Sequence, residues 1–190
     1  MNANTPHYSA TAIGLHWLMA MALASLFAVG LYMVDLPLSP WKLKVFSWHK
    51  WAGVTLFSLA LLRLAYRAGH APPPMPTSMP ALQRSAAHFA HILLYVLMIA
   101  IPLSGWLMSS AKGFQTVLFG VLPIPDLLEK DKELGKVLEF VHHTLNYLLA
   151  ALVAGHAGAA IKHHLIDKDD VLARMLPWRT ASGHGRESAP

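Results

Sequence analysis

Four long apolar stretches, separated by shorter polar segments, set the pattern of this 190-residue chain. They cover residues 11–34, 45–66, 86–109 and 140–161. Each has about the 20 residues that an α-helix needs to cross the hydrocarbon core of a bilayer. We therefore expect an all-α membrane protein: a four-transmembrane-helix bundle over residues 1–177 with both termini on the same side. The polar tail, residues 178–190, is expected to be disordered.

The segments between the apolar stretches contain residues that end or bend helices. Pro37 and Pro40 separate the first two stretches, and proline cannot continue a helix. Residues 71–80 are rich in proline and should form a stiff connector. Pro102 lies near the far end of the third stretch, where we expect a kink. Residues 110–133 form the longest connection, with room for a short interfacial helix.

The composition narrows the chemistry. Hydrophobic residues make up 55% of the chain and charged residues 13%, whereas a soluble domain carries about 25% charged residues. The chain has no cysteine, which excludes disulfides, thiolate-held iron–sulfur clusters and covalent haem attachment. Any haem must be held by non-covalent axial ligands. We expect the lipid bilayer, and not a nucleic acid, to be the large partner of this chain.

The distribution of positive charge says little about orientation. The first stretch has no basic leading segment and is too long for a signal-peptide core, so we expect it to remain as a helix. Of the 15 lysines and arginines, all six arginines fall on the side shared by the termini, and seven lysines fall on the other side. The positive-inside rule therefore gives almost no indication of which side of the membrane the termini face. We expect the termini to be cytoplasmic.

Four histidines lie inside the apolar stretches: His16, His49, His142 and His156. The last two are fourteen residues apart in one helical pattern, which is about 3.9 turns or roughly 21 Å along one face. Depth pairs His49 with His142 on the outer side and His16 with His156 on the inner side. Two such pairs are what two b-type haems would require. Paired imidazoles leave no open iron position, which suits electron transfer.

Neighbouring residues fit this interpretation without demanding it. Gly30 lies fourteen residues beyond His16, and Gly105 lies fourteen beyond His91; both admit a bulky ring or, equally, a packed helix. Arg63 follows His49 by fourteen residues and could pair with haem propionates, although an interfacial anchor is the alternative. Of the adjacent pair, His142 shares the face of His156, whereas His143 is turned away.

Several short motifs are shared with a known family, and they span residues 13–177. They are Ile13-Gly14-Leu15-His16-Trp17, Trp48-His49-Lys50-Trp51-Ala52-Gly53, Ala87-His88-Phe89-Ala90-His91, Ile99-Ala100-Ile101-Pro102-Leu103-Ser104-Gly105, His142-His143-Thr144-Leu145, Gly155-His156-Ala157 and Arg174-Met175-Leu176-Pro177. In these the chain resembles the bacterial cytochrome b561 family of di-haem, four-helix membrane cytochromes. The resemblance implies the same two axial pairs, His16 with His156 and His49 with His142. Some members of this family resemble a superoxide oxidase, and related cytochromes serve dehydrogenases or hydrogenases as membrane subunits.

The leading hypothesis is a superoxide:ubiquinone oxidoreductase of the bacterial inner membrane. A basic cluster near His49 would attract the superoxide anion, with plain interfacial solvation as the alternative; it comprises Lys42, Lys44 and Lys50. The electron would pass from the outer haem to the inner one and then to ubiquinone. Three residues could help protonate the quinone: His163, His91 and Lys162.

Two other functions remain open from the sequence. The chain could be an electron-transfer cytochrome b subunit that docks a partner dehydrogenase or hydrogenase through the mixed charges of residues 112–139. A histidine-based metal transporter is the third reading. It is disfavoured because such a site would add acids or cysteines at the membrane midplane, where this chain has none.

Overall fold

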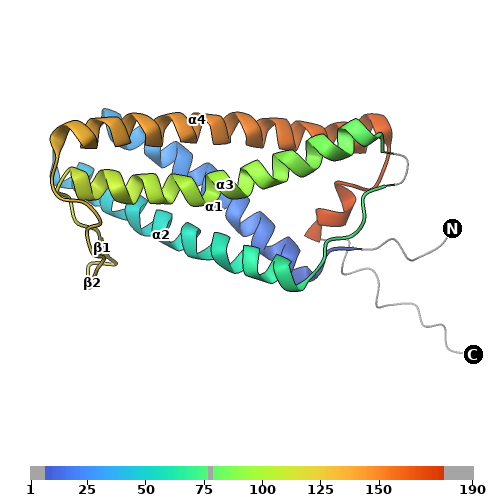
Figure 1. Ribbon diagram of the computed structural model, residues 1–190, viewed down its shortest axis with the longest axis horizontal. Helices are drawn as coiled ribbons and strands as arrows, with labels where there is room; N and C mark the ends of the chain where they lie inside the picture. The colour runs from blue at the N-terminus through green and yellow to red at the C-terminus, as the bar shows by residue number, and fades with distance from the viewer. Residues whose placement is uncertain (1–6, 77–78, 178–190) are drawn as a thin grey trace, which may run out of the picture.

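Four long helices make up most of the computed structural model, which describes residues 7–76 and 79–177 (Figure 1). They are α1 (Ala10–Asp35), α2 (Pro40–Gly69), α3 (Ala81–Ala111) and α4 (Lys132–Lys162). A π-helical turn, η1 (His163–Asp167), extends α4, and a short 3-10 helix, η2 (Ala173–Met175), follows it. The tail for which we expected disorder, residues 178–190, lies outside the described residues. The all-helical expectation is otherwise confirmed.

Three of the helical segments are long and apolar enough to cross a membrane: α1, α3, and α4 with its extension. They cover Ala10–Asp35, Ala81–Ala111 and Lys132–Asp167. The fourth helix, α2, is as long as the others but carries lysines and arginines along its length, which lowers its hydropathy. The structure therefore supports three apolar spans by composition, and the role of α2 depends on where its charges lie.

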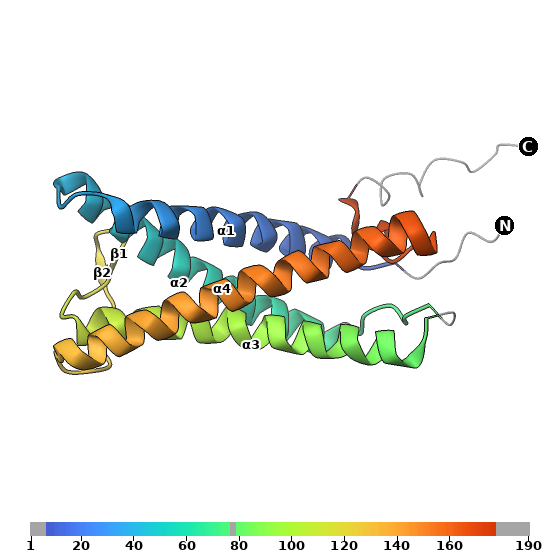
Figure 2. The same cartoon turned by 90° about the horizontal axis from the view of Figure 1, so that it is seen from above.

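The helices pack as two pairs, α1 with α2 and α3 with α4, joined by a smaller α2–α3 contact. Figure 2 shows α4 crossing the bundle obliquely over the other helices. Figure 1 shows that α1 begins and α4 ends at one end of the bundle, which we call the terminal end. The strands β1 (Val117–Leu118) and β2 (Leu122–Pro123) lie at the opposite end, which we call the hairpin end.

Side-chain caps start three of the helices. Ser9 Oγ accepts a hydrogen bond from the Ala12 amide at 3.2 Å, and Ser39 Oγ accepts one from the Lys42 amide at 3.2 Å. Asp131 caps α4 in the same way. Pro40 is therefore the first residue of α2 and not merely a stop to α1, because the first turn of a helix needs no amide donor from proline.

A β-hairpin stands where the sequence left room for an interfacial helix, so that expectation is wrong. β1 and β2 pair antiparallel, with Leu118 opposite Leu122. Three residues connect the strands, and the first two, Phe119 and Gly120, have positive φ angles of 51° and 77°. The Val121 amide donates to the Leu118 carbonyl at 3.1 Å and closes a tight turn around them. The indole of Trp51 donates to the carbonyl of Val117 at 2.7 Å and ties the hairpin to α2.

The segment after α4 folds back over the terminal end. The Trp17 indole donates to the Met175 carbonyl at 2.6 Å, and Arg174 Nη1 donates to the Pro74 carbonyl at 2.6 Å. Arg174 also forms an ion pair with Asp170 at 2.9 Å. The C-terminal segment is thereby fixed to both α1 and the proline-rich connector.

Candidate functional site

Each of the four helices repeats the same spacing, seven residues between three levels of the bundle. Seven residues are nearly two helical turns, or about 10.5 Å of rise. The levels divide the interior into three layers. The terminal layer comprises His16, Arg63, His91 and His156. The middle layer comprises Leu23, Leu56, Met98 and Leu149, and the hairpin layer comprises Gly30, His49, Gly105 and His142.

The terminal layer brings three imidazoles together. The ring centres of His16 and His156 are 6.2 Å apart, and those of His91 and His156 are 5.4 Å apart. Arg63 Nη2 lies 3.1 Å from Nδ1 of His16. The guanidinium groups of Arg63 and Arg67 lie over the ring of Tyr95 at 6.0 and 5.8 Å. Positive charge and imidazole thus meet at one depth.

The middle layer is apolar and closely packed. Leu56 and Met98 belong to one buried cluster, which also holds Met19. Leu149 belongs to a second cluster with Leu97, and Leu23 packs against both clusters. The two polar layers are therefore separated by hydrocarbon side chains from all four helices.

In the hairpin layer, glycines face the histidine rings. A Cβ at position 105 would lie 3.1 Å from Cε1 of His142 and 3.4 Å from its Nδ1, which is tighter than ordinary contact. A Cβ at position 30 would lie 3.5 Å from Cε1 of His49. Glycine on α3 therefore lets the His142 ring approach the backbone.

The hydrogen bonds of His142 define its tautomer. Nδ1 lies 3.1 Å from the Ile101 carbonyl and 3.0 Å from Ser104 Oγ. A carbonyl can only accept, so Nδ1 carries the proton, and Nε2 of the neutral ring keeps its lone pair. Asn146 Nδ2 donates to the His142 carbonyl at 2.7 Å and braces α4 at the same place. His49 differs, because its buried Nδ1 has no hydrogen-bond partner within the described residues.

These features fit axial ligation of haem iron. Imidazole ligands of metals donate their second nitrogen's proton to a carbonyl or similar acceptor, as His142 does. Two imidazoles that bind one ion from opposite sides, through bonds of ~2 Å, would have their ring centres roughly 6 Å apart. His16 and His156 have that separation. The bare lone pair at Nε2 of His142, the orphaned Nδ1 of His49 and the glycines opposite both rings suit a large ring held by imidazoles.

The three lysines singled out from the sequence have different surroundings at the hairpin end. Lys42 Nζ donates to the carbonyls of Val34 and Leu36 at 3.1 and 2.6 Å, where α1 ends. Lys50 Nζ donates to the Phe114 carbonyl at 2.8 Å. Lys44 is exposed on the first turns of α2. Lys42 and Lys50 therefore also stabilise backbone at this end.

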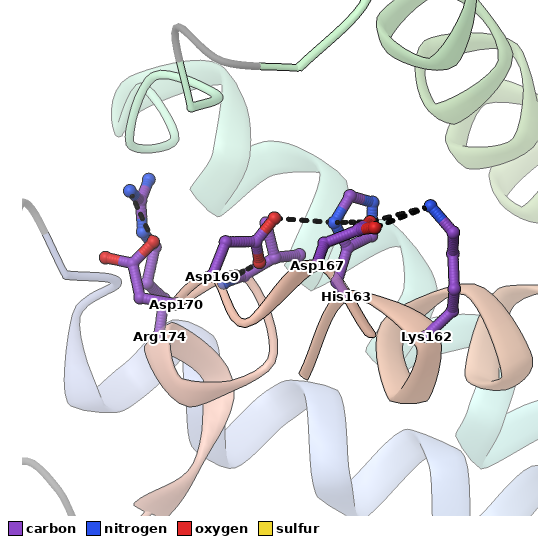
Figure 3. Close-up of polar contacts among 7 residues, drawn as sticks. Lys162, His163, Asp167, Asp169, Asp170 and Arg174 are labelled. Atoms are coloured by element: carbon purple, nitrogen blue, oxygen red, sulfur yellow. Dashed lines mark hydrogen bonds and ion pairs between the residues drawn. The ribbon is translucent and has the colours of Figure 1, made fainter. Parts of the chain in front are cut away.

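The three quinone candidates do not form one cluster. Figure 3 shows His163 and Lys162 joined through the carboxylate of Asp167 at the end of α4. Nδ1 of His163 lies 2.6 Å from Asp169 and 3.2 Å from Asp167, and Lys162 Nζ lies 2.7 Å from Asp167. His91 belongs instead to the terminal layer, against His156.

Two aspartates of this cluster were not anticipated. Asp167 and Asp169 follow His163 by four and six residues, and a carboxylate four residues along a helix is a readable signal. The chain turns back at Lys168, which has a left-handed conformation with φ of 55°, and this brings Asp169 to His163. His163, Asp167 and Asp169 offer ligand atoms within 4.8 Å of one another, but Lys162 already neutralises Asp167.

Comparison with known proteins gives consistent matches over nearly the whole chain. The sequence model of the family described as prokaryotic cytochrome b561 matches residues 7–178. The chain is 36% identical to "Cytochrome b561 homolog 2" of Escherichia coli (strain K12), over 96% of this chain and 97% of that protein. It is 32% identical to "Cytochrome b561 homolog 1" of the same organism, over 90% and 98%. It is 27% identical to "Probable superoxide oxidase CybB" of Yersinia pestis, over 90% and 96%.

Proposed function

Because the chain belongs to the prokaryotic cytochrome b561 family, we propose that it carries electrons from superoxide at the hairpin end to ubiquinone at the terminal end. Family membership implies haem b and an electron-transfer role in the membrane. The observation that carries the finer proposal is the pair of histidine layers separated by an apolar layer.

Four histidines are assigned as axial ligands of two haems. His49 and His142 hold the group of the hairpin layer, and His16 and His156 hold that of the terminal layer. When bound, the haems would supply irons that change by one electron. His16 is chosen over His91 as the partner of His156 because its ring lies at the separation that a shared ion requires.

In this proposal Arg63 has two alternative partners, His16 and a haem propionate. Its contact with Nδ1 of His16 places an arginine donor on that nitrogen, which must then accept. If His16 bound iron through Nε2, its proton would lie on Nδ1, and Arg63 would lose this acceptor. The guanidinium of Arg63 would then be available to hold a haem propionate, since its fork matches a carboxylate.

We assign α2 as a fourth membrane span, with the chain in the bacterial inner membrane and its termini in the cytoplasm. Two charged groups of α2 have partners on other elements: Lys50 donates to the Phe114 carbonyl at the hairpin end, and Arg63 contacts His16 in the terminal layer. Charges within a span are tolerated where they face the interior and are paired. The pairing of these two charges supports the assignment of α2 as a span.

Superoxide is proposed as the donor on two grounds. Lys42, Lys44 and Lys50 place positive charge at the hairpin end near His49, and such charge raises the encounter rate of a small anion. One relative carries the name probable superoxide oxidase. For the acceptor, the pair of His163 with Asp169 can hold a proton beside a reduced quinone, with Lys162 close by and His91 one layer deeper.

The test begins with a dithionite-reduced minus oxidised absorption spectrum of the purified chain and its haem content. We expect two haems per chain, reduced by superoxide and reoxidised by a ubiquinone analogue. The rate should fall with added salt and with Lys44→Ala, whereas Lys136→Ala removes an equal charge already paired with Glu133 and should have little effect. Colourless protein would favour metal transport, and haems that superoxide does not reduce would refute the donor.

The alternative, a cytochrome b subunit for a partner dehydrogenase or hydrogenase, has one observation in its favour. The hairpin tip leaves apolar side chains exposed at the end of the bundle; Val121 is 81% exposed and Phe119 is 62% exposed. A redox partner that co-purifies with the wild-type chain and is lost after Val121→Asp would support this function.

A further inference from the structure

Ser104 is a buried hydroxyl in contact with a proposed iron ligand. Ser104 is only 6% exposed and lies in an apolar part of α3. Oγ donates to the Ile101 carbonyl at 2.7 Å and lies 3.0 Å from Nδ1 of His142. We propose that Ser104 is a positioning residue for His142. Its hydroxyl oxygen shares the Nδ1 proton of His142 with the Ile101 carbonyl and so fixes the ring with Nε2 free for iron. This inference rests on the proposed function.

The direction of each hydrogen bond follows from the atoms involved. The Ile101 carbonyl only accepts, so it takes a proton both from Ser104 and from Nδ1 of His142. The serine hydroxyl has then used its hydrogen and turns an oxygen lone pair toward Nδ1. The three groups form a closed triangle, with sides of 2.7, 3.0 and 3.1 Å. Rotation of the ring would break two hydrogen bonds together.

One turn of α3 provides all three features that hold the His142 ring. Ile101 gives the carbonyl, Ser104 the hydroxyl, and Gly105 the space into which the ring fits. His49, in the same layer, has no such support: its Nδ1 is buried without a hydrogen-bond partner in the part of the chain that the structure describes. The protein therefore orients the two rings of this layer unequally, and Ser104 acts on one of them.

This arrangement has an electronic consequence for a bound iron. A hydrogen bond from Nδ1–H raises the basicity of the ring and strengthens its donation through the other nitrogen. Stronger donation stabilises ferric over ferrous iron. Removal of the Ser104 hydroxyl takes away one of two acceptors and should shift one haem toward its reduced form.

The experiment is an optical redox titration of the purified full chain, with the ferric electron paramagnetic resonance spectrum as a second readout. In Ser104→Ala, we expect the ferrous-to-ferric ratio of one haem at a given potential to rise several-fold and up to about tenfold. A tenfold rise is a shift of ~59 mV in the reduction potential for one electron. The other haem should not move. The resonance of one ferric haem should change as its axial ring loses its fixed orientation.

Two further variants separate positioning from packing. Ser104→Thr keeps the hydroxyl and should restore both the potential and the resonance. Ser109→Ala removes another buried α3 hydroxyl, which donates to the Phe114 carbonyl and touches no histidine, and should behave as wild type. Potentials unchanged in Ser104→Ala, or moved equally by Ser109→Ala, would overturn this inference and leave the two-haem proposal intact. Wild-type protein that binds no haem would overturn both.

Discussion

At the scale of single residues, adjacent histidines on α4 occupy different environments. His142 is half-buried and hydrogen-bonded to α3, whereas His143 is exposed. His156 is half-buried in the terminal layer, whereas His164, just beyond α4, is exposed. The same side chain therefore serves as a candidate ligand or as a surface group according to its position around the helix.

This contrast provides matched substitutions. We expect His142→Ala and His156→Ala each to lose one of two haems, because each removes an axial ligand from a different layer. His143→Ala and His164→Ala should keep both. Haem content per chain, measured on purified protein, checks the prediction; two haems retained in either of the first two variants would contradict the ligand assignment.

The glycines of the hairpin layer predict a graded effect. A Cβ at position 105 would press on the His142 ring at 3.1 Å, while one at position 30 would meet His49 at 3.5 Å, an ordinary contact. Gly105→Ala should therefore displace a ligand and alter or abolish one haem spectrum. Gly30→Ala should be mild, since alanine also gains roughly 1 kcal/mol of helix propensity over glycine. Equal behaviour of the two variants in reduced-minus-oxidised spectra would be evidence against this seat.

Residue spacing along the sequence predicted part of the site. Fourteen-residue intervals brought out His142 and His156 because a helix returns to nearly the same face after that distance. The contact of His91 with His156 was not predicted, because it depends on the rotation of α3 relative to α4, which hydropathy does not encode. The contact of Ser104 with His142 was not predicted for a similar reason. A serine in an apolar helix is interpreted as a packing residue until its partner on the neighbouring helix is known.

At the scale of elements, the helices are longer than their apolar parts. The fourth apolar stretch begins at residue 140, but α4 begins at Lys132, directly after its cap at Asp131. Polar turns continue a helix outside the bilayer until a cap ends it, so hydropathy underestimates the length. The hairpin of β1 and β2 depends on a non-glycine residue, Phe119, at positive φ, for which the sequence contains no clear signal.

The cap of α4 gives a prediction at this scale. Asp131 accepts from the amides of Glu133 and Leu134 at 2.9 and 3.1 Å. Asp131→Ala should lower the free energy of unfolding by about 1 kcal/mol, as loss of an N-cap does. Asp131→Asn retains an acceptor and should lose much less. Thermal or denaturant unfolding of the purified chain measures both, and an unchanged midpoint for Asp131→Ala would show that the cap is unimportant.

At the scale of the whole molecule, the order of the helices predicts which loops share a side. If α2 crosses the membrane, the connector at residue 71 lies on the opposite side from Leu38, in the loop that joins α1 to α2. The absence of cysteine allows this to be tested without background. We expect Leu38→Cys to react with an impermeant maleimide in spheroplasts, because this position is 86% exposed. Ala71→Cys should react only after permeabilisation; labelling of both in intact spheroplasts would refute the four-span topology.

The apolar middle layer has a consequence for energy conservation. Leu23, Leu56, Met98 and Leu149 fill the level between the two histidine layers with apolar side chains, which relay no proton. An electron tunnelling inward past them would cross as an uncompensated charge. A membrane potential that is negative inside opposes such a step by about 2.3 kcal/mol for each 100 mV. Turnover would therefore be electrogenic and would slow as the cell becomes more strongly polarised.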